Sequence, residues 1–190
     1  MKAVLLFILL GFLNHPLNLG VIKSYKTNSA ASSMSILGTS TLHDWEMTAA
    51  NLQGSMHVDL YQDSLDIQDL SLVVPVASLK SGKRAMDNNA YKALKAKDHK
   101  EIKYRLKAIS KLKKTSDGSF MALSTGVLQV AGVSKTLNIP ITVKVQKGGI
   151  VLSGTSTFKM SLFDVEAPSF MMGAVSTGDE ITINFSINYN

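Results

Sequence analysis

The sequence predicts an all-β protein, an antiparallel barrel of about eight strands with one helical insertion. Three observations predict this class. Apolar and polar residues alternate along most of the chain, many of the alternating runs are long, and short turns separate them. Alternation places successive side chains on opposite faces of a strand, and closing long strands into a barrel removes exposed edges. A β-sandwich is the alternative that this pattern leaves open.

The composition is that of one globular domain. The chain has 190 residues, of which 45% are hydrophobic and 18% are charged, so it is long enough to bury a sizeable core. It has no cysteine, which excludes disulfides, thiolate metal sites and a cysteine nucleophile.

The amino terminus has the form of a secretory signal peptide. Lys2 precedes an apolar run from Ala3 to Leu13, which is shorter than the roughly 20 residues that span a bilayer. We expect residues 1–20 to be the signal peptide, and residues 21–190 to be the mature domain in the periplasm or outside the cell. An uncleaved amino-terminal anchor is the alternative.

The first predicted strands follow this segment. Residues 21–33 are either a first strand or a lead-in, and an extended segment then starts at Met34. After Trp45 the alternation has a period of two, with apolar residues at alternate positions over 56–60 and 70–76. Each of these two runs is predicted to be a half-buried strand.

Residues 83–97 predict the one helical insertion. Apolar residues recur every four positions from Met86 to Leu94, with Tyr91 beside them, which places an apolar stripe on one side of a helix. Two asparagines at 88–89 weaken the helix, so it is either one short helix or two turns with a break. The stripe either packs on the core or forms a lid over the barrel mouth, where it would also contact a ligand.

Strands resume after the helix. The alternating runs lie at 102–108, 120–130, 137–145, 150–160 and 181–189. A hairpin turn is predicted over 111–118. A loop with an apolar centre is predicted over 166–178, and it either folds back on the core or lines an opening. Pro140 has no N–H group, which indicates an edge or an irregular pairing within its strand.

Basic residues gather in one region of the sequence. The formal net charge is +6, and residues 80–114 contain thirteen Lys or Arg against three acidic residues. Such a region could meet an anionic membrane surface, although much of it is the outer face of the strand at 102–108. Few aromatic residues lie among the basic ones, so no binding of nucleic acid is expected.

No motif predicts a catalytic site. His43, Asp44 and Glu46 lie close in sequence, but alternation places His43 on one face and the two acids on the other. We expect His43 to have a structural or hydrogen-bonding role. The chain shows no serine triad, phosphate-binding loop or metal-ligand spacing, so we expect a protein that is not an enzyme and that has no cofactor or metal.

Several residue strings follow one another in a distinctive order. They are GTSTLHDW at 38–45 and VPVASLKSG at 74–82, then shorter strings at 86–87, 93–94, 126–128, 132–135, 154, 163–164 and 168. This ordered set, which covers residues 24–189, resembles the YceI-like family of bacterial polyisoprenoid-binding proteins. Glu46 departs from the glycine that commonly follows the tryptophan in that family, and this departure concerns the ligand rather than the fold.

The resemblance implies a lipocalin-like barrel of eight antiparallel strands whose apolar interior takes a long lipid chain. We therefore predict a non-enzymatic protein that binds and transports or sequesters a long apolar lipid, such as a polyisoprenoid or an isoprenoid quinone. Two alternatives stay open. One is an envelope stress or interaction module with a solid barrel core, and the other is a lipid-acting enzyme that uses His43 and Asp44.

The candidate ligand-binding residues are the aromatic and methionine side chains that the pattern places at the cavity or its mouth, together with nearby apolar residues. They are Trp45, Met86, Tyr91, Leu94, Met160, Phe163, Phe170 and Met171. The candidates for contact with a lipid head group are the cations next to the helix start. They are Lys80, Lys83 and Arg84.

Overall fold

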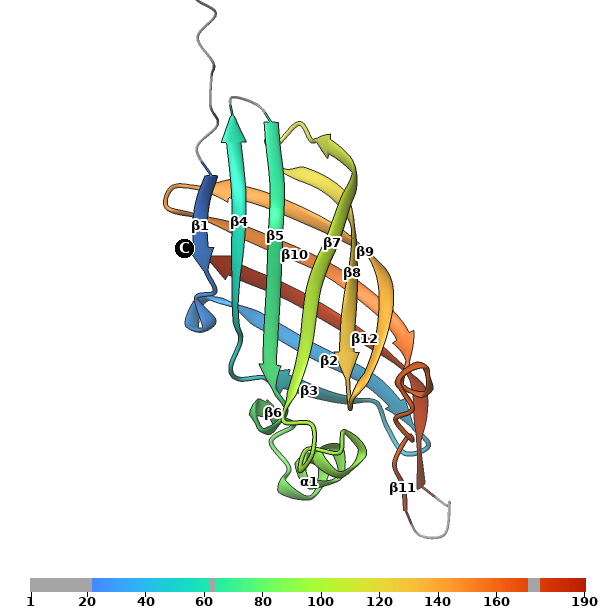
Figure 1. Ribbon diagram of the computed structural model, residues 1–190. Helices are drawn as coiled ribbons and strands as arrows, with labels where there is room; N and C mark the ends of the chain where they lie inside the picture. The colour runs from blue at the N-terminus through green and yellow to red at the C-terminus, as the bar shows by residue number, and fades with distance from the viewer. Residues whose placement is uncertain (1–21, 62–63, 171–174) are drawn as a thin grey trace, which may run out of the picture.

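A single antiparallel sheet curls into a barrel, with one α-helix at its lower end (Figure 1). The computed structural model describes residues 22–61, 64–170 and 175–190. The expected signal peptide at 1–20 lies outside the described residues, as does Met171. The prediction of an all-β antiparallel barrel is confirmed, and the sheet is continuous, unlike the two sheets of a sandwich.

The described residues form twelve strands, where about eight were predicted. The strands are β1 Ile22–Lys26, β2 Ser33–Ser40, β3 Trp45–Ala49, β4 Gln53–Tyr61, β5 Ser64–Pro75, β6 Leu79–Lys80, β7 Glu101–Lys114, β8 Phe120–Val130, β9 Val133–Gln146, β10 Gly149–Lys159, β11 Ser169–Phe170 and β12 Val175–Tyr189. The helical segments are η1 Ser29–Ala31, η2 Val76–Ser78, α1 Arg84–Ala93 and η3 Met160–Phe163. The count differs because β1, β3, β6 and β11 are too short to show a clear alternating pattern.

Both edges of the sheet are tied back to other strands. The order is β1-β4-β5-β7-β8-β9-β10-β12-β2-β3-β6, with β11 on β12. At one edge, the backbones of Lys26 and Asn190 exchange hydrogen bonds of 3.0 and 2.9 Å, and Thr27 bridges Tyr189. At the other edge, β6 continues from β5 through η2 and pairs with β3. Hydrogen bonding therefore ties the carboxyl-terminal end of β1 to the end of β12, and β6 to β3.

The helix is shorter than predicted. It runs from Arg84 to Ala93 without a break, and residues 94–98 form turns. Lys95 has a φ of 52°, a left-handed conformation that ends a helix. The asparagines at 88–89 therefore do not divide the helix, and the lysine-rich end of the predicted segment is turn.

The ladder between β9 and β10 stops halfway along β9. It ends at the pair of Gly154 and Ile141, next to Pro140, while β9 stays paired with β8 to its beginning. The irregular pairing predicted at Pro140 is confirmed, and its strand is an interior one. Phe163 of η3 is 1% exposed and packs edge-on against Phe158, with ring centroids 5.4 Å apart, beside the diverging strands.

The loop predicted at 166–178 is partly strand. Ser169 pairs with Ser176, and Phe170 pairs with Val175, so the ends of this segment lie side by side. The strand β12 therefore begins at Val175, earlier than the predicted start at 181. Likewise, β7 extends to Lys114, so only residues 115–118 of the turn predicted at 111–118 lie outside the strand.

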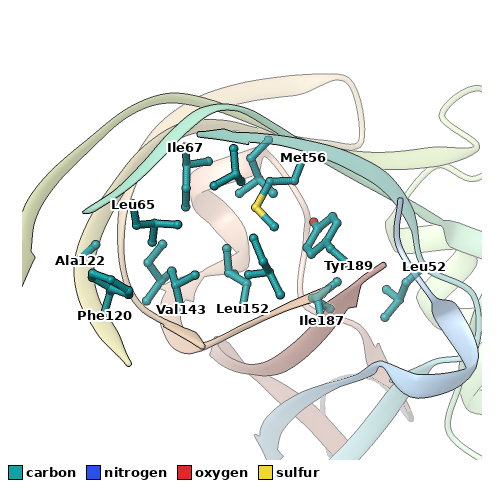
Figure 2. Packing of buried hydrophobic residues seen from close by; sticks show 14 of the residues in the cluster. Leu52, Met56, Leu65, Ile67, Phe120, Ala122, Val143, Leu152, Ile187 and Tyr189 are labelled. Atoms are coloured by element: carbon teal, nitrogen blue, oxygen red, sulfur yellow. The ribbon is translucent and has the colours of Figure 1, made fainter. Parts of the chain in front are cut away.

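A packed plug fills the upper end of the barrel. We use this name for the buried residues Met56, Val58, Leu65, Ile67, Phe120, Ala122, Val143 and Ile150. They lie toward the strand ends that are farthest from α1 (Figure 1). Phe120 and Val143, for example, are paired near that end of β8 and β9. Figure 2 shows several of these side chains pointing toward one another. The plug closes the barrel at the end opposite to the helix.

Candidate ligand-binding cavity

A cavity of about 470 Å³ lies in the barrel between the plug and α1. Its volume is within the range of roughly 300–1,000 Å³ that is typical of small-molecule sites. Tyr189, Ile187 and Leu152, which adjoin the plug, line its inner end. Val74, Ile102 and Leu128 belong to the wall nearer to the helix. The barrel is therefore neither solid nor hollow throughout, since one end is packed and the other is open.

The mouth of the cavity lies at the turn before β3 and the start of α1. Leu42 lines the cavity and is 69% exposed, so its side chain sits at the rim. His43 and Lys83 are also exposed and line the cavity. Among the described residues that line it, Lys83 has the only fixed positive charge, and none is acidic. Positive charge at this site is thus confined to the rim.

Three glycines make room for aromatic rings on the cavity wall. Gly38 pairs with Trp45 across β2 and β3, and Gly154 pairs with Phe185 across β10 and β12. A Cβ at either glycine would overlap the ring of its partner. Gly126 stands under the ring of Tyr104 in the same way. All three rings line the cavity, and the missing side chains let them lie against the wall.

Of the predicted site residues that the structure describes, six line the cavity. They are Trp45, Met86, Leu94, Met160, Phe163 and Lys83. Trp45 is held in place by a 3.0 Å hydrogen bond from its Nε1 to the carbonyl oxygen of Thr39. Met86 and Leu94 contact the core cluster from α1, so the helical stripe both packs on the core and covers the cavity. These positions fit contact with a ligand, which stays a prediction.

Tyr91, Lys80 and Arg84, whose side chains the structure describes, are not among the residues that line the cavity. The Tyr91 hydroxyl donates to the carbonyl oxygens of Leu79 and Ala77 at 2.8 and 3.1 Å, which turns it toward the backbone. Lys80 Nζ donates to that hydroxyl at 2.8 Å, and this hydrogen bond raises the pKa of Lys80. Arg84 is exposed at the start of the helix. For Phe170, only the backbone is described.

A buried carboxylate holds the segment that carries Lys83. Asp87 is 8% exposed, and its Oδ1 accepts hydrogen bonds from the Ser81 hydroxyl at 2.7 Å and the Ser81 amide at 2.8 Å. These bonds hold the pKa of Asp87 below its usual value. The Ser81 hydroxyl also accepts from the Lys83 amide at 3.2 Å. The rim next to α1 is thus fastened to the helix itself.

The described histidines do not form a catalytic cluster. His43 Nδ1 lies 2.7 Å from the Asp44 carbonyl oxygen, and His57 Nδ1 lies 3.6 Å from Asp69 on the exposed face of another strand pair. The ring of His99 lies against Gly132. No group of three or more His, Asp or Glu in the described part of the chain is placed to hold a metal ion.

Sequence reasoning missed several residues of the cavity. Tyr104, Ser124 and Tyr189 line it, and each lies on the inward side of its strand. Alternation contained this signal, because Ser124 falls in the same inward row as Phe120 and Ala122. Leu42 carried no signal, since it lies in a turn where alternation has no meaning.

A family model for the YceI-like domain matches residues 25–189. The chain belongs to the YceI-like family. This YceI-like domain resembles solved structures of low sequence identity, and no curated protein matches it in sequence. In the described residues it has no helix with the length and apolar character needed to cross a membrane.

Three solved structures illustrate the likeness. BcnA from Burkholderia cenocepacia has a TM-score of 0.69 and 18% identity, over 85% of this chain and 98% of that one. A polyisoprenoid-binding domain from Saccharophagus degradans, implicated in plant cell wall breakdown, has a TM-score of 0.67 and 12% identity, over 87% and 97%. A Campylobacter jejuni YceI protein has a TM-score of 0.56 and 20% identity, over 99% and 97%. At such identities, the structures show that the YceI-like domain shares their fold.

Proposed function

We propose that this YceI-like domain binds a long apolar lipid of the isoprenoid class in its barrel, without catalysis, and carries or sequesters it. The observation that carries the proposal is the apolar cavity, closed by the plug and open beside α1. The relative from Saccharophagus degradans, described as polyisoprenoid-binding, supports the choice of ligand class. We further propose that the protein acts in the periplasm or outside the cell after loss of residues 1–20.

Apolar burial would drive the binding. At about 0.8 kcal/mol per buried CH₂, a segment of about fifteen carbons would gain roughly 12 kcal/mol. Association and ordering cost an estimated 4–15 kcal/mol, so the net affinity depends on how well the chain fits. The packed plug limits how far a chain can enter, and a longer lipid would extend through the mouth.

Lys83 is the cation best placed to meet an anionic or polar head group. It lines the mouth, whereas Lys80 is bound to Tyr91 and Arg84 lies outside the cavity wall. We expect Lys83→Glu to weaken the binding of farnesyl phosphate about fivefold or more, because it reverses the one fixed positive charge among the described residues of the wall. Lys92→Glu, on the exposed side of the same helix, is the matched control. Equal effects of both variants would contradict this role.

The test of the function is direct. The purified protein is extracted with organic solvent, and the extract is examined by mass spectrometry for isoprenoid lipids. The stripped protein is then titrated with farnesol while the fluorescence of Trp45, the sole tryptophan, is followed. We expect a co-purified isoprenoid and saturable titration. A protein that yields no lipid and takes up none would refute the proposal and favour the alternative of an interaction module.

Transient contact with an anionic membrane would deliver the ligand to the mouth. Leu42 is exposed at the rim, and residues 80–100 next to it contain seven Lys or Arg and two Asp. We expect Leu42→Ser to reduce cosedimentation with phosphatidylglycerol vesicles. Leu112→Ser, which changes an exposed leucine near the end of β7 that lies away from α1, should have no effect. Retained binding of the Leu42 variant would count against a mouth-first approach.

A further inference from the structure

The inner part of the cavity contains a pair of hydroxyl groups. The Tyr104 hydroxyl and Ser124 Oγ lie 2.5 Å apart, and both residues line the cavity. Ser124 is 2% exposed and stands one inward position from Ala122 of the plug. The pair therefore lies deep in a cavity whose other inner residues are mainly apolar.

The pair has one hydrogen-bond donor left over. Each hydroxyl has one hydrogen, and the single bond between the two uses one of them. No second bond of either hydroxyl is present among the described residues. Burial raises the pKa of Tyr104, so its hydroxyl stays protonated at neutral pH. A buried donor without an acceptor is unfavourable, and a ligand oxygen at this depth would relieve that cost.

The surroundings determine which kind of oxygen fits. Among the described residues, no lysine, arginine or acidic side chain lines the inner end, and Lys83 lies at the mouth. A phosphate or carboxylate at the pair would bury a charge without a partner, which is strongly unfavourable. A neutral acceptor such as a ketone, quinone or ether oxygen needs only one donor.

We infer that Tyr104 and Ser124 form a binding site for a neutral acceptor oxygen on the buried end of the lipid. The inference rests on the proposed function and adds an orientation to it. The ligand carries an oxygen at the end that enters first, and any charged group stays at the mouth with Lys83. The lipid class is thus an oxygenated apolar chain, distinguished from a plain hydrocarbon by one hydrogen bond.

The experiment compares two probes, farnesylacetone, which ends in a ketone, and the hydrocarbon of the same carbon skeleton. Both are titrated against the stripped protein by Trp45 fluorescence. We expect the ketone to bind about tenfold more tightly than the hydrocarbon, which is typical of one buried hydrogen bond. In the double variant Tyr104→Phe/Ser124→Ala, the two probes should bind equally. The variant keeps the ring of Tyr104 and removes both partners of the pair, a change that is close to neutral for stability.

Tyr189→Phe is the matched control. Its hydroxyl also lies at the inner end, but it donates to the Ser71 carbonyl oxygen, at 3.5 Å. This variant should keep the preference for the ketone. The infrared carbonyl band of bound farnesylacetone gives a second readout, and it should lie at lower wavenumber in the wild type than in the double variant.

The outcomes separate the two proposals. If the hydrocarbon binds and the wild type shows no preference for the ketone, the oxygen site is refuted while lipid binding stands. A preference that survives in the double variant, or that disappears in Tyr189→Phe, also refutes it. If neither probe binds, the proposed function fails and the oxygen site fails with it.

Discussion

Gly38 sets the position of Trp45 because it has no side chain. A Cβ at this position would overlap the indole ring, which already forms a hydrogen bond with Thr39 and lies on the cavity wall. A side chain at 38 would therefore push the ring into the cavity. The same relation holds at Gly126 and Gly154. The inner width of the barrel therefore depends on three glycines, which leave room for the neighbouring rings because they have no side chain.

We expect Gly38→Ala to destabilise the protein by about 1–3 kcal/mol, the usual cost of overpacking. It should also weaken the binding of farnesol, because the displaced indole occupies ligand space. The free energy of unfolding is measured in urea and the affinity by competition with a fluorescent fatty acid. The double variant Gly38→Ala/Trp45→Leu should recover affinity, and no recovery would show that the ring is not the obstacle.

The lowered pKa of Asp87 leads us to expect that the stability of the protein depends on pH. Its pKa is lowered in the folded state by the two hydrogen bonds from Ser81. A depressed folded pKa contributes stability above the unfolded value of about 3.8, and this contribution is lost as the pH falls through the folded pKa. We expect Asp87→Asn to be less stable than the wild type at pH 7, with a difference that shrinks at pH 3. A difference independent of pH, in urea unfolding, would contradict this assignment.

The sequence predicted whether a side chain points inward better than it predicted which groups that side chain contacts. Trp45 and Met160 lie on the wall, as alternation and the family resemblance led us to expect. Tyr91 lies on the apolar stripe, yet its hydroxyl reaches the backbone of Leu79, an acceptor 12 positions earlier in the chain. Periodicity contains no information on where such an acceptor lies, so the sequence could not predict the hydrogen bonds that the Tyr91 hydroxyl forms.

At the scale of elements, η3 covers the place where β9 and β10 part. Its position depends on Asp179 of β12, whose two carboxylate oxygens accept hydrogen bonds from the Ser161 amide at 2.8 Å and the Ser161 hydroxyl at 2.6 Å. These bonds lower the pKa of Asp179. Phe163 and Val165, which line the cavity, follow directly on this anchor.

We expect Asp179→Asn to speed the exchange of ligand several-fold while changing the equilibrium affinity less. The amide keeps one acceptor but loses the charge-assisted pair, so η3 is held less firmly. Stopped-flow fluorescence of Trp45 measures both rate constants. Asp117→Asn, which changes a comparable hydroxyl-bonded carboxylate in the turn before β8, should leave the rates unchanged. A faster exchange in both variants would point to a general loss of stability.

Elements with strong periodicity were predictable, and their ends were not. Strands β8 and β10 have nearly the predicted bounds, because their alternation is long and regular. The helix ends at Ala93, shortly before Lys95, which has a left-handed backbone conformation. The lysines that follow are compatible with a helix, so composition did not indicate this end. The early start of β12 depends on pairing with β2 and β11, which no local pattern encodes.

At the scale of the whole molecule, stability and binding are assigned to opposite ends of the barrel. Met56 belongs to the plug and is fully buried, whereas Met34 lines the cavity and is only partly buried. We expect Met56→Ala to cost about 2–5 kcal/mol of unfolding free energy, as for other buried large-to-small changes. Its effect on farnesol affinity should be small.

Met34→Ala is the matched substitution on the cavity wall. It should cost less stability, because the side chain borders open space, and it should change the affinity more. Both variants are measured by urea unfolding and by fluorescence titration. If the two substitutions have the same effects on both quantities, the division between plug and cavity is wrong.

The overall architecture followed from the sequence, but the filling of the barrel did not. Alternation shows which residues face inward, and Phe120 and Leu128 of β8 both do so. One lies in the plug and the other on the cavity wall, although they are alike in class and spacing. The difference depends on what the opposite strands contribute at each level, which only the assembled sheet determines.

The separation of the plug from the cavity has a consequence for how such a domain can change over time. Substitutions on the cavity wall alter the shape and polarity presented to a lipid while the packed end continues to hold the strands together. A new ligand preference can therefore arise without an intermediate that fails to fold. The need for a stable fold constrains the residues of the plug, whereas ligand binding constrains the residues of the cavity wall. The sequences of the two halves can therefore diverge at different rates.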